Sequence, residues 1–200
     1  RKVLAELSML RQFGGDPRLH YEDYKAGSAK LDTCMELVHG ALDGGHRILL
    51  FSQFTGMLDI IGKRLAKEDI AFLKLTGASS KESRAKMVAQ FQAGEVPVFL
   101  ISLKAGGVGL NLTAADVVIH YDPWWNVAAQ DQATDRAHRI GQQHTVTVYK
   151  LIAKDTIEER IMQMQESKRD LVNSVLGGDG ISSALFTRED VLALLGGDGR

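Results

Sequence analysis

The sequence lacks the features that mark most specialised protein classes. Its 200 residues include one cysteine, Cys34, so no disulfide can form within the chain, and this suits a reducing compartment. It has no run of about 18 apolar residues that could cross a membrane, and we expect no signal peptide. Its formal net charge is −1, so any contact with nucleic acid must come from a local patch.

The remaining composition is that of an ordinary globular domain. Hydrophobic residues make up 44% and charged residues 24%, and a chain of this length can bury a core without disulfides or bound metals to stabilise it. Apolar runs alternate with helical patterns: strands are expected at 47–51, 72–75, 96–102, 117–121 and 146–152, and helices at 54–67, 80–92 and 127–138. The alternation predicts an α/β fold, with a parallel sheet buried on both faces by helices, although the strand order cannot be read from the sequence. Cys34 lies in an apolar-periodic stretch, and we interpret it as a small core residue.

Two segments, one before and one after the predicted α/β domain, are expected to be appendages to it. A short helix near the start is broken at 14–17, and a second helix is expected from about Ser28 to Leu42, while 155–176 is a long, charged amphipathic helix. A glycine-rich tail with a short terminal helix at 188–195 follows it. Because the chain begins with Arg1, we expect it to be a piece of a longer protein.

The stretch 130–142, QDQATDRAHRIGQ, carries the most specific pattern. On a helix, its residues Gln132, Asp135, Arg136 and Arg139 would share one face. Two guanidinium groups one turn apart suit a polyanion, because each planar fork of donors fits phosphate oxygens. The alternative is a solvated helix face with an intrahelical Asp–Arg pair. Another face carries small residues suited to packing against a sheet: Ala129, Ala133 and Ala137.

A glycine-rich turn follows the strand that is expected to end at Ser102. The residues Gly106, Gly107 and Gly109 would let backbone N–H groups approach an anion closely. A dinucleotide-binding loop is an alternative, but its G-x-G-x-x-G pattern is incomplete because Leu112 replaces the third glycine.

The segment YDPWWN ends the next expected strand, and Pro123 stops that strand. Adjacent tryptophans can lie in a core or stack on nucleic-acid bases. We expect Trp124 in the core and Trp125 exposed.

Taken together, SLKAGGVGLNLTAADVVIHYDPWWNVAAQDQATDRAHRIGQ closely resembles the fifth and sixth helicase motifs of the Swi/Snf family, within helicase superfamily two. Upstream, ILLFSQFTGMLDII resembles the family's fourth motif, LTGASSKESRAKMVAQFQ the segment after it, and MLRQFGGDPRL the inter-lobe segment. Downstream, VTVYKLIAKDTIEERIMQMQESKRDLV resembles the strand and brace helix that close the second lobe. Two places depart from the pattern: Val127 stands where proline is common, and 13–15 stand where cysteine or histidine is usual.

The resemblance covers about residues 7–176 and implies a RecA-like, three-layer α/β domain. The sheet would be mainly parallel, with helices on both faces and a C-terminal brace helix. The implied divisions are an inter-lobe segment at 1–28, the second RecA-like helicase lobe at 29–154, the brace helix at 155–176 and a flexible tail at 177–200. The parent would be a DNA-dependent ATPase that translocates on duplex DNA and remodels protein–DNA complexes.

Site residues follow from the resemblance position by position. Arg136 and Arg139 match the sixth-motif arginines, which act as arginine fingers on the γ-phosphate of ATP bound to the first lobe. Other nucleotide-facing positions are Gln132 and Asp135 in the same motif and Gly107 and Gly109 in the fifth. Positions along the DNA backbone are Ser52, Gln53, Gly77, Ser79, Ser102 and Lys104, and Trp125 matches a tryptophan at the DNA groove. No metal site is predicted, since the histidines lack partners at ligand spacing.

The implied cofactor is ATP with Mg²⁺, bound mainly by a first lobe that this chain lacks. Neither the phosphate-binding G-x-x-x-x-G-K-[ST] loop nor an acidic D-E-x-x motif occurs in the sequence, so the chain alone should bind no nucleotide and hydrolyse none. The expected partners are the first lobe of the same polypeptide, the backbone of double-stranded DNA and, as a remodelling target, a DNA-bound protein; no membrane is expected. The expected location is the bacterial cytoplasm, at the nucleoid, or the nucleus of a eukaryote.

Three other interpretations remain open at this stage. The chain could be a stand-alone binding module that hydrolyses nothing, which a Walker loop upstream in the parent would exclude. It could be the lobe of an RNA helicase, which strand-separation assays on RNA and DNA would distinguish. It could be a dinucleotide-binding oxidoreductase domain, which would bind a nicotinamide cofactor.

Overall fold

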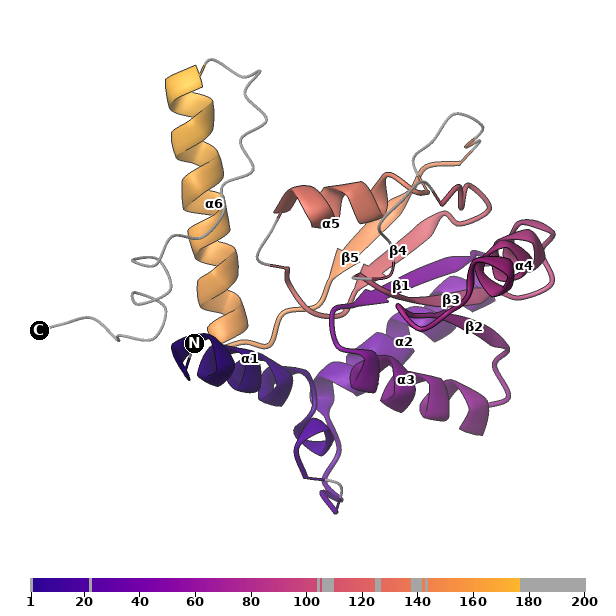
Figure 1. Ribbon diagram of the computed structural model, residues 1–200, viewed down its shortest axis with the longest axis horizontal. Coiled ribbons are helices and arrows are strands. Elements are labelled where there is room, and N and C mark those ends of the chain that lie inside the picture. Colours follow the sequence, from indigo (N-terminus) through magenta and orange to yellow (C-terminus); the bar gives the residue numbers. More distant parts are fainter. Residues whose placement is uncertain are drawn as a thin grey trace, which may run out of the picture.

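A computed structural model of the chain (Figure 1) describes residues 2–21, 23–103, 105, 110–124, 127–137, 142 and 144–176, and within them the side chains of all but 2–4, 127–129 and 168–176. The elements, in chain order, are α1 (Lys2–Gly15), a 3₁₀ turn η1 (Pro17–Leu19), α2 (Ala29–Asp43), β1 (Ile48–Ser52), α3 (Thr55–Lys67), β2 (Phe72–Leu75), α4 (Lys81–Gln92), β3 (Val98–Ser102), β4 (Val117–His120), α5 (Val127–Thr134), β5 (Thr147–Lys150) and α6 (Ile157–Leu176).

The five described strands form one parallel sheet, which confirms the predicted α/β class. Their order is β2-β3-β1-β4-β5, so β1 is central, with Ile48 level with Val98 of β3 and with Val117 of β4. A helix or a long segment connects each strand to the next one in the chain, as parallel strands require. The order places the ends of β3, β1 and β4 beside one another at one edge of the sheet.

Alternate residues of the strands feed two separate apolar clusters. Ile48 and Leu50 pack with α2 and α3 on one face, whereas Leu49 and Phe51 pack with α4 and α5 on the other. Figure 1 shows the sheet between these two helical layers. Every residue of β1, β3 and β4 is buried, as expected for strands covered on both faces. The same expectation is wrong for the two edge strands: β5 is exposed along its length, and only Leu75 of β2 is fully buried.

Serine side chains cap the first turns of α2 and α4. The hydroxyl of Ser28 caps α2 by accepting a hydrogen bond from the Leu31 N–H (3.3 Å), and Ser80 caps α4 in the same way from the Ser83 N–H (3.1 Å). Cys34 lies fully buried in α2, where burial raises the pKa of its thiol to about 12. The interpretation of this cysteine as a core residue is confirmed.

The helix predicted at 127–138 ends early. Helix α5 stops at Thr134, and the chain continues in turns to residue 137, with Ala137 donating to the Thr134 carbonyl (3.0 Å). A tertiary contact explains the early stop: the Leu112 N–H donates to the Arg136 carbonyl (3.0 Å), which draws the chain toward the sheet. Ala133 and Ala137 are buried there, as the small-residue stripe predicted, whereas the side chain of Ala129 lies outside the described residues.

The two appendages pack against each other and against the carboxyl edge of the sheet. In Figure 1, α6 begins beside α1 and projects away from the sheet on the side remote from α4. The tail at 177–200, with its predicted terminal helix, lies outside the described residues.

Candidate functional site

The carboxyl ends of the strands form the polar edge of the sheet. After β1 the chain turns to α3 on one face, whereas after β3 it contributes Ala105 and Leu112 to the cluster on the other face. Chains that leave adjacent strands in opposite directions open a crevice, which is where parallel α/β sheets bind ligands. Ser52 and Ser102 lie level with each other at this point.

Asp122, just after β4, holds the turn that follows β1. One of its carboxylate oxygens accepts the Ser52 hydroxyl (2.5 Å), and the other accepts the Gln53 N–H (3.0 Å). The Ser52 hydroxyl oxygen also accepts the Phe54 N–H (3.1 Å). Asp122 and Ser52 are almost completely buried, so this arrangement gives Gln53 a fixed backbone position at the edge.

The next two carbonyls receive side chains from distant elements. The guanidinium of Arg11 in α1 and the amide of Gln53 (3.3 Å) both donate to the Pro123 carbonyl. Gln165 of α6 donates to the Trp124 carbonyl. Arg11 is 2% exposed; burial lowers its pKa to about 10, although the carboxylates of Asp122 and Glu158 act in the opposite direction.

A second buried group of polar side chains anchors the start of α6. The carboxylate of Glu158 accepts Lys30 of α2 (2.5 Å) and the Ala153 N–H (2.8 Å). Burial raises the pKa of Glu158, and Lys30 opposes that rise. Beside them, the Tyr121 hydroxyl donates to the Gly15 carbonyl (3.1 Å), which fixes the end of α1 against β4.

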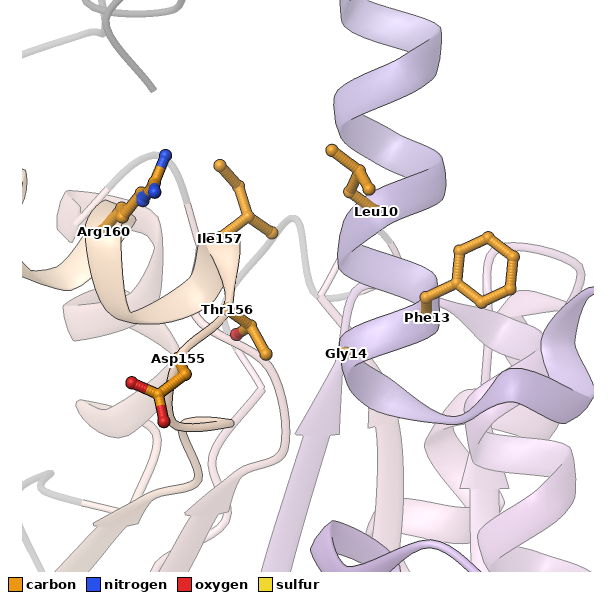
Figure 2. Close-up of a pocket in the computed structure, with 7 residues that line it drawn as sticks. All are labelled: Leu10, Phe13, Gly14, Asp155, Thr156, Ile157 and Arg160. Carbon is orange, nitrogen blue, oxygen red and sulfur yellow. The ribbon is translucent and has the colours of Figure 1, made fainter. Parts of the chain in front are cut away.

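A hollow of about 450 Å³ separates α1 and α6 on the outer side of these contacts. Figure 2 shows Leu10 of α1 and Ile157 of α6 on its opposite walls, with Asp155 and Thr156 at its lower side. Its walls are largely apolar and come from the two appendages, and none of the predicted nucleotide- or DNA-facing residues lines it.

The structure divides the predicted nucleotide-facing residues. Arg136 is 4% exposed and lies with the buried alanines, whereas Gln132 and Asp135 are exposed. The prediction that these three share one helix face is therefore wrong, because α5 ends before Asp135 and the turn rotates Arg136 inward. Three further predicted residues lie outside the described ranges: Gly107, Gly109 and Arg139.

Most of the predicted DNA-facing residues gather at the carboxyl edge with unequal exposure. Ser52 and Ser102 are 0% and 1% exposed, so their side chains face the interior. Gly77 is exposed in the turn after β2, and Ser79 and Gln53 are half-buried. Lys104 and Trp125 lie outside the described residues.

Trp124, expected in the core, is only half-buried. Its segment turns toward α6, where Gln165 binds its carbonyl, and its own N–H donates to the Gln130 side chain (3.2 Å).

Sequence reasoning missed three residues that shape this edge: Arg11, Asp122 and Arg84. The Arg84 guanidinium donates to the carbonyls of Ala105 (2.8 Å), Ser79 (3.0 Å) and Thr76 (3.3 Å), so it ties the turn after β2 to the loop after β3. The sequence did contain a signal for Arg84. A cation in the first turn of a helix is unfavourable with the helix dipole, so its presence there indicates a tertiary contact. Asp122 also gave a signal, because it directly follows the apolar strand predicted at 117–121.

The described ranges hold no group of three His, Cys, Asp or Glu side chains that could bind a metal ion. No helix in the same ranges combines the length and the apolar character that crossing a bilayer requires.

Comparisons with known proteins identify this arrangement. The family described as helicase conserved C-terminal domain matches residues 29–141. An uncharacterized ATP-dependent helicase of Mycoplasma pneumoniae is 46% identical over 168 residues, 84% of this chain and 16% of that protein. The human chromatin-remodeling ATPase INO80 is 44% identical over 169 residues, 84% of this chain and 11% of that protein. The chain thus spans a small part of the curated relatives it matches.

A solved structure extends the similarity to the fold. The Sulfolobus solfataricus SWI2/SNF2 ATPase core in complex with dsDNA superposes with a TM-score of 0.74 at 37% identity, covering 94% of this chain and 40% of that one. The parallel sheet, the match over 29–141 and these relatives agree: the chain belongs to the helicase conserved C-terminal domain family and is a C-terminal lobe of the SNF2 type within helicase superfamily two.

Proposed function

We propose that this lobe is the second half of a DNA-dependent ATPase that translocates on duplex DNA and remodels protein–DNA complexes. The observation that carries the proposal is the polar carboxyl edge, with Gln53 at the topological switch point between β1 and β3 and with Gly77 and Ser79 in the turn after β2, at the same end of the sheet. It occurs in a lobe whose structural neighbour was solved with dsDNA and whose relatives include a chromatin-remodeling ATPase. In this proposal the DNA-bound protein to be remodelled is a partner of the whole motor.

The nucleotide-facing part of the proposal rests on Arg136 and Arg139. We assign to them the positive charge at the γ-phosphate of ATP that the first lobe binds with Mg²⁺; because Arg136 is 4% exposed in this lobe, its guanidinium must turn outward to reach that phosphate. The other residues that we assign to this site are Gln132 and Asp135 of the sixth motif and Gly107 and Gly109 of the fifth. The hydrogen bond from Leu112 to the Arg136 carbonyl supports this assignment, because it joins the sixth motif to the segment after the glycine-rich turn. A fixed backbone keeps a guanidinium in place as charge develops in the transition state.

The DNA-facing part rests on residues with accessible polar groups. We assign phosphate contacts to Gln53, Gly77 and Ser79, together with Lys104 and Trp125. The buried positions Ser52 and Ser102 act by shaping the edge, since their hydroxyls face inward. Backbone contacts of this kind carry no base information, so binding is sequence-independent and weakens as salt rises.

Half of the machinery is absent from this sequence, which has neither a P-loop nor an acidic metal-binding motif. ATP bridges the two lobes, so binding closes the cleft between them and hydrolysis opens it. Alternating grip by the two lobes then moves the duplex. The isolated chain accordingly hydrolyses no ATP and, at a net charge of −1, binds DNA weakly. We place the motor in the bacterial cytoplasm at the nucleoid, or in the nucleus of a eukaryote.

The test uses the two-lobe parent protein and measures ATP hydrolysis with and without duplex DNA. Arg136→Ala and Arg139→Ala should each lower DNA-stimulated hydrolysis by about 10³-fold or more, the usual contribution of an arginine finger. Arg64→Ala is the matched control, because Arg64 is an exposed arginine of α3 that pairs with Glu68. Wild type that hydrolyses ATP but ignores duplex DNA would exclude the DNA part, and RNA would then be tried. Arginine variants as active as the control would exclude the nucleotide part.

A further inference from the structure

One short segment collects hydrogen bonds from three elements that are remote in sequence. The segment 122–124, here called the DPW segment, consists of Asp122, Pro123 and Trp124. Its carboxylate and two of its carbonyls accept hydrogen bonds from α1, from the turn after β1 and from α6. The helix before the lobe and the helix after it thus meet at one place on the DNA-facing edge.

The carbonyl of Pro123 is the point where these contacts meet. It accepts both the guanidinium of Arg11 and the side-chain amide of Gln53. Arg11 is nearly completely buried, and Asp122 and Glu158 lie close enough to act on its charge. Because a buried charge bound to a carbonyl is held strongly, the position of α1 sets the position of Pro123 and, through it, of Gln53.

We propose that the DPW segment is a positioning relay, in which Arg11 of α1 and Gln165 of α6 set the orientation of Gln53 and so control how tightly this lobe engages the DNA backbone. The relay rests on the proposed function for its effect on DNA. Its geometric part stands without DNA, since it concerns contacts within this chain. Arg11 and Gln165 are positioning residues, whereas Gln53 is the residue that touches phosphate.

The relay explains why buried polar groups, rather than apolar side chains alone, join α1 and α6 to the sheet. Apolar side chains would join α1 and α6 to the sheet without the desolvation of a guanidinium and two carboxylates. Polar groups fix direction as well as proximity, because a hydrogen bond weakens when its donor turns away. Movement of α1 or α6, which flank the lobe in sequence, is therefore transmitted to the turn that carries Gln53.

The first measurement is hydrogen exchange in the parent protein without DNA. The Gln53 N–H donates to Asp122, so its exchange reports the state of the relay. Arg11→Ala should speed deuterium uptake at residues 52–54 about tenfold, and Gln165→Ala, a milder change at the Trp124 carbonyl, should speed it less. Arg18→Ala is the matched control, an arginine of the same N-terminal segment whose guanidinium is bound by Asp16 (2.9 Å). It should leave uptake at 52–54 unchanged.

The second measurement is a double-mutant cycle on DNA-stimulated ATP hydrolysis. Arg11→Ala should raise the duplex concentration at half-maximal stimulation about tenfold and change the KM for ATP less than twofold, and Arg11→Lys should recover part of the loss. In a Gln53→Ala background the effect of Arg11→Ala should shrink to twofold or less, because both act through one carbonyl. In a Ser79→Ala background the full tenfold effect should remain.

The outcomes separate the two proposals. Unchanged uptake at 52–54 in both Arg11→Ala and Gln165→Ala overturns the relay, whatever DNA does. A full Arg11 effect that persists in the Gln53→Ala background also overturns it, since Arg11 would then act by another route. Wild type without DNA stimulation overturns the proposed function, while the uptake result still decides whether Arg11 and Gln165 position Gln53.

Discussion

The two ends of the same sheet use polar side chains in opposite ways. At the amino end, Asp116 accepts hydrogen bonds from His46 (2.7 Å) and from the Arg47 N–H (3.0 Å), and half of the His46 side chain is open to solvent. At the carboxyl end, the pair Lys30–Glu158 has side chains only 7% and 0% exposed. Each end has a pair of an acidic and a basic side chain, but only the pair at the carboxyl end is buried away from water.

This difference shows what each end contributes. Exposed pairs at the amino end stabilise a sheet terminus weakly, because water competes for the same groups. The buried pair at the carboxyl end costs desolvation free energy. It lies in the region where hydrogen bonds also fix the orientation of Asp122 and Gln53. In parallel α/β domains the carboxyl end is also the end that binds ligands.

The largest expected effect comes from breaking the buried pair. Lys30→Met removes the cation and leaves the Glu158 carboxylate buried with the Ala153 N–H, which should lower the free energy of unfolding by about 3–5 kcal/mol. Urea denaturation at pH 7 measures the loss. The loss should shrink as pH falls, because burial already raises the pKa of Glu158 and protonation removes the uncompensated charge.

A double variant sharpens this test. Lys30→Met combined with Glu158→Leu replaces both charges by apolar groups, and it should recover most of the lost stability. A cost below about 1 kcal/mol for Lys30→Met alone would mean that this pair behaves like an exposed one. The contrast between the two ends would then not hold.

The second prediction uses His120, which ends β4 at the carboxyl edge. Its Nε2 lies 3.0 Å from the Thr134 hydroxyl, its ring stacks on Phe51, and its Nδ1 has no hydrogen-bond partner among the described residues. Burial, helped by the charge of Lys150, lowers its pKa to about 4.

Because the folded pKa of His120 lies below the unfolded value of about 6.5, the unfolded chain takes up this proton first as pH falls. Stability should therefore decrease between about pH 6.5 and pH 4, by up to about 3 kcal/mol from this residue. His120→Gln keeps a donor near Thr134 and cannot titrate. Unfolding free energies at several pH values should show a shallower slope for this variant, and parallel curves would show that His120 does not titrate as its burial requires.

Local patterns predicted much of the fold. The run ILLFS of β1 indicated a buried strand because both of its faces are covered, and the helical pattern at 80–92 indicated α4, whose first turn the Ser80 hydroxyl caps. Strand order was not predictable, since every apolar strand can pair with every other. The end of α5 was missed because it depends on a bond from Leu112 to Arg136, and this bond lies outside any local window.

The candidate site was predictable only in part, because its contacts also join residues that are far apart in sequence. Family resemblance assigned Ser52 and Gln53 to positions along the DNA backbone, but it did not show that Ser52 is buried against Asp122, 70 residues away in sequence. Arg11 reaches the Pro123 carbonyl across 112 residues, and no spacing rule links two such positions. The predicted roles of Arg139 and Trp125 remain predictions, since both lie outside the described residues.

The smallest expected effect comes from His46, the exposed counterpart of His120. Burial alone would raise the pKa of Asp116, but hydrogen bonds from His46 and from the Arg47 N–H lower it overall. His46→Ala removes one of these two bonds and leaves the other, so it should lower the free energy of unfolding by about 1 kcal/mol or less at pH 6. The loss should fall further in 1 M salt, where a pair half open to solvent is screened, while the cost of Lys30→Met should change little because its partners are buried. Denaturation of both variants at low and high salt therefore tests the contrast directly, and a salt-insensitive cost for His46→Ala would show that the amino end also holds its pair away from water.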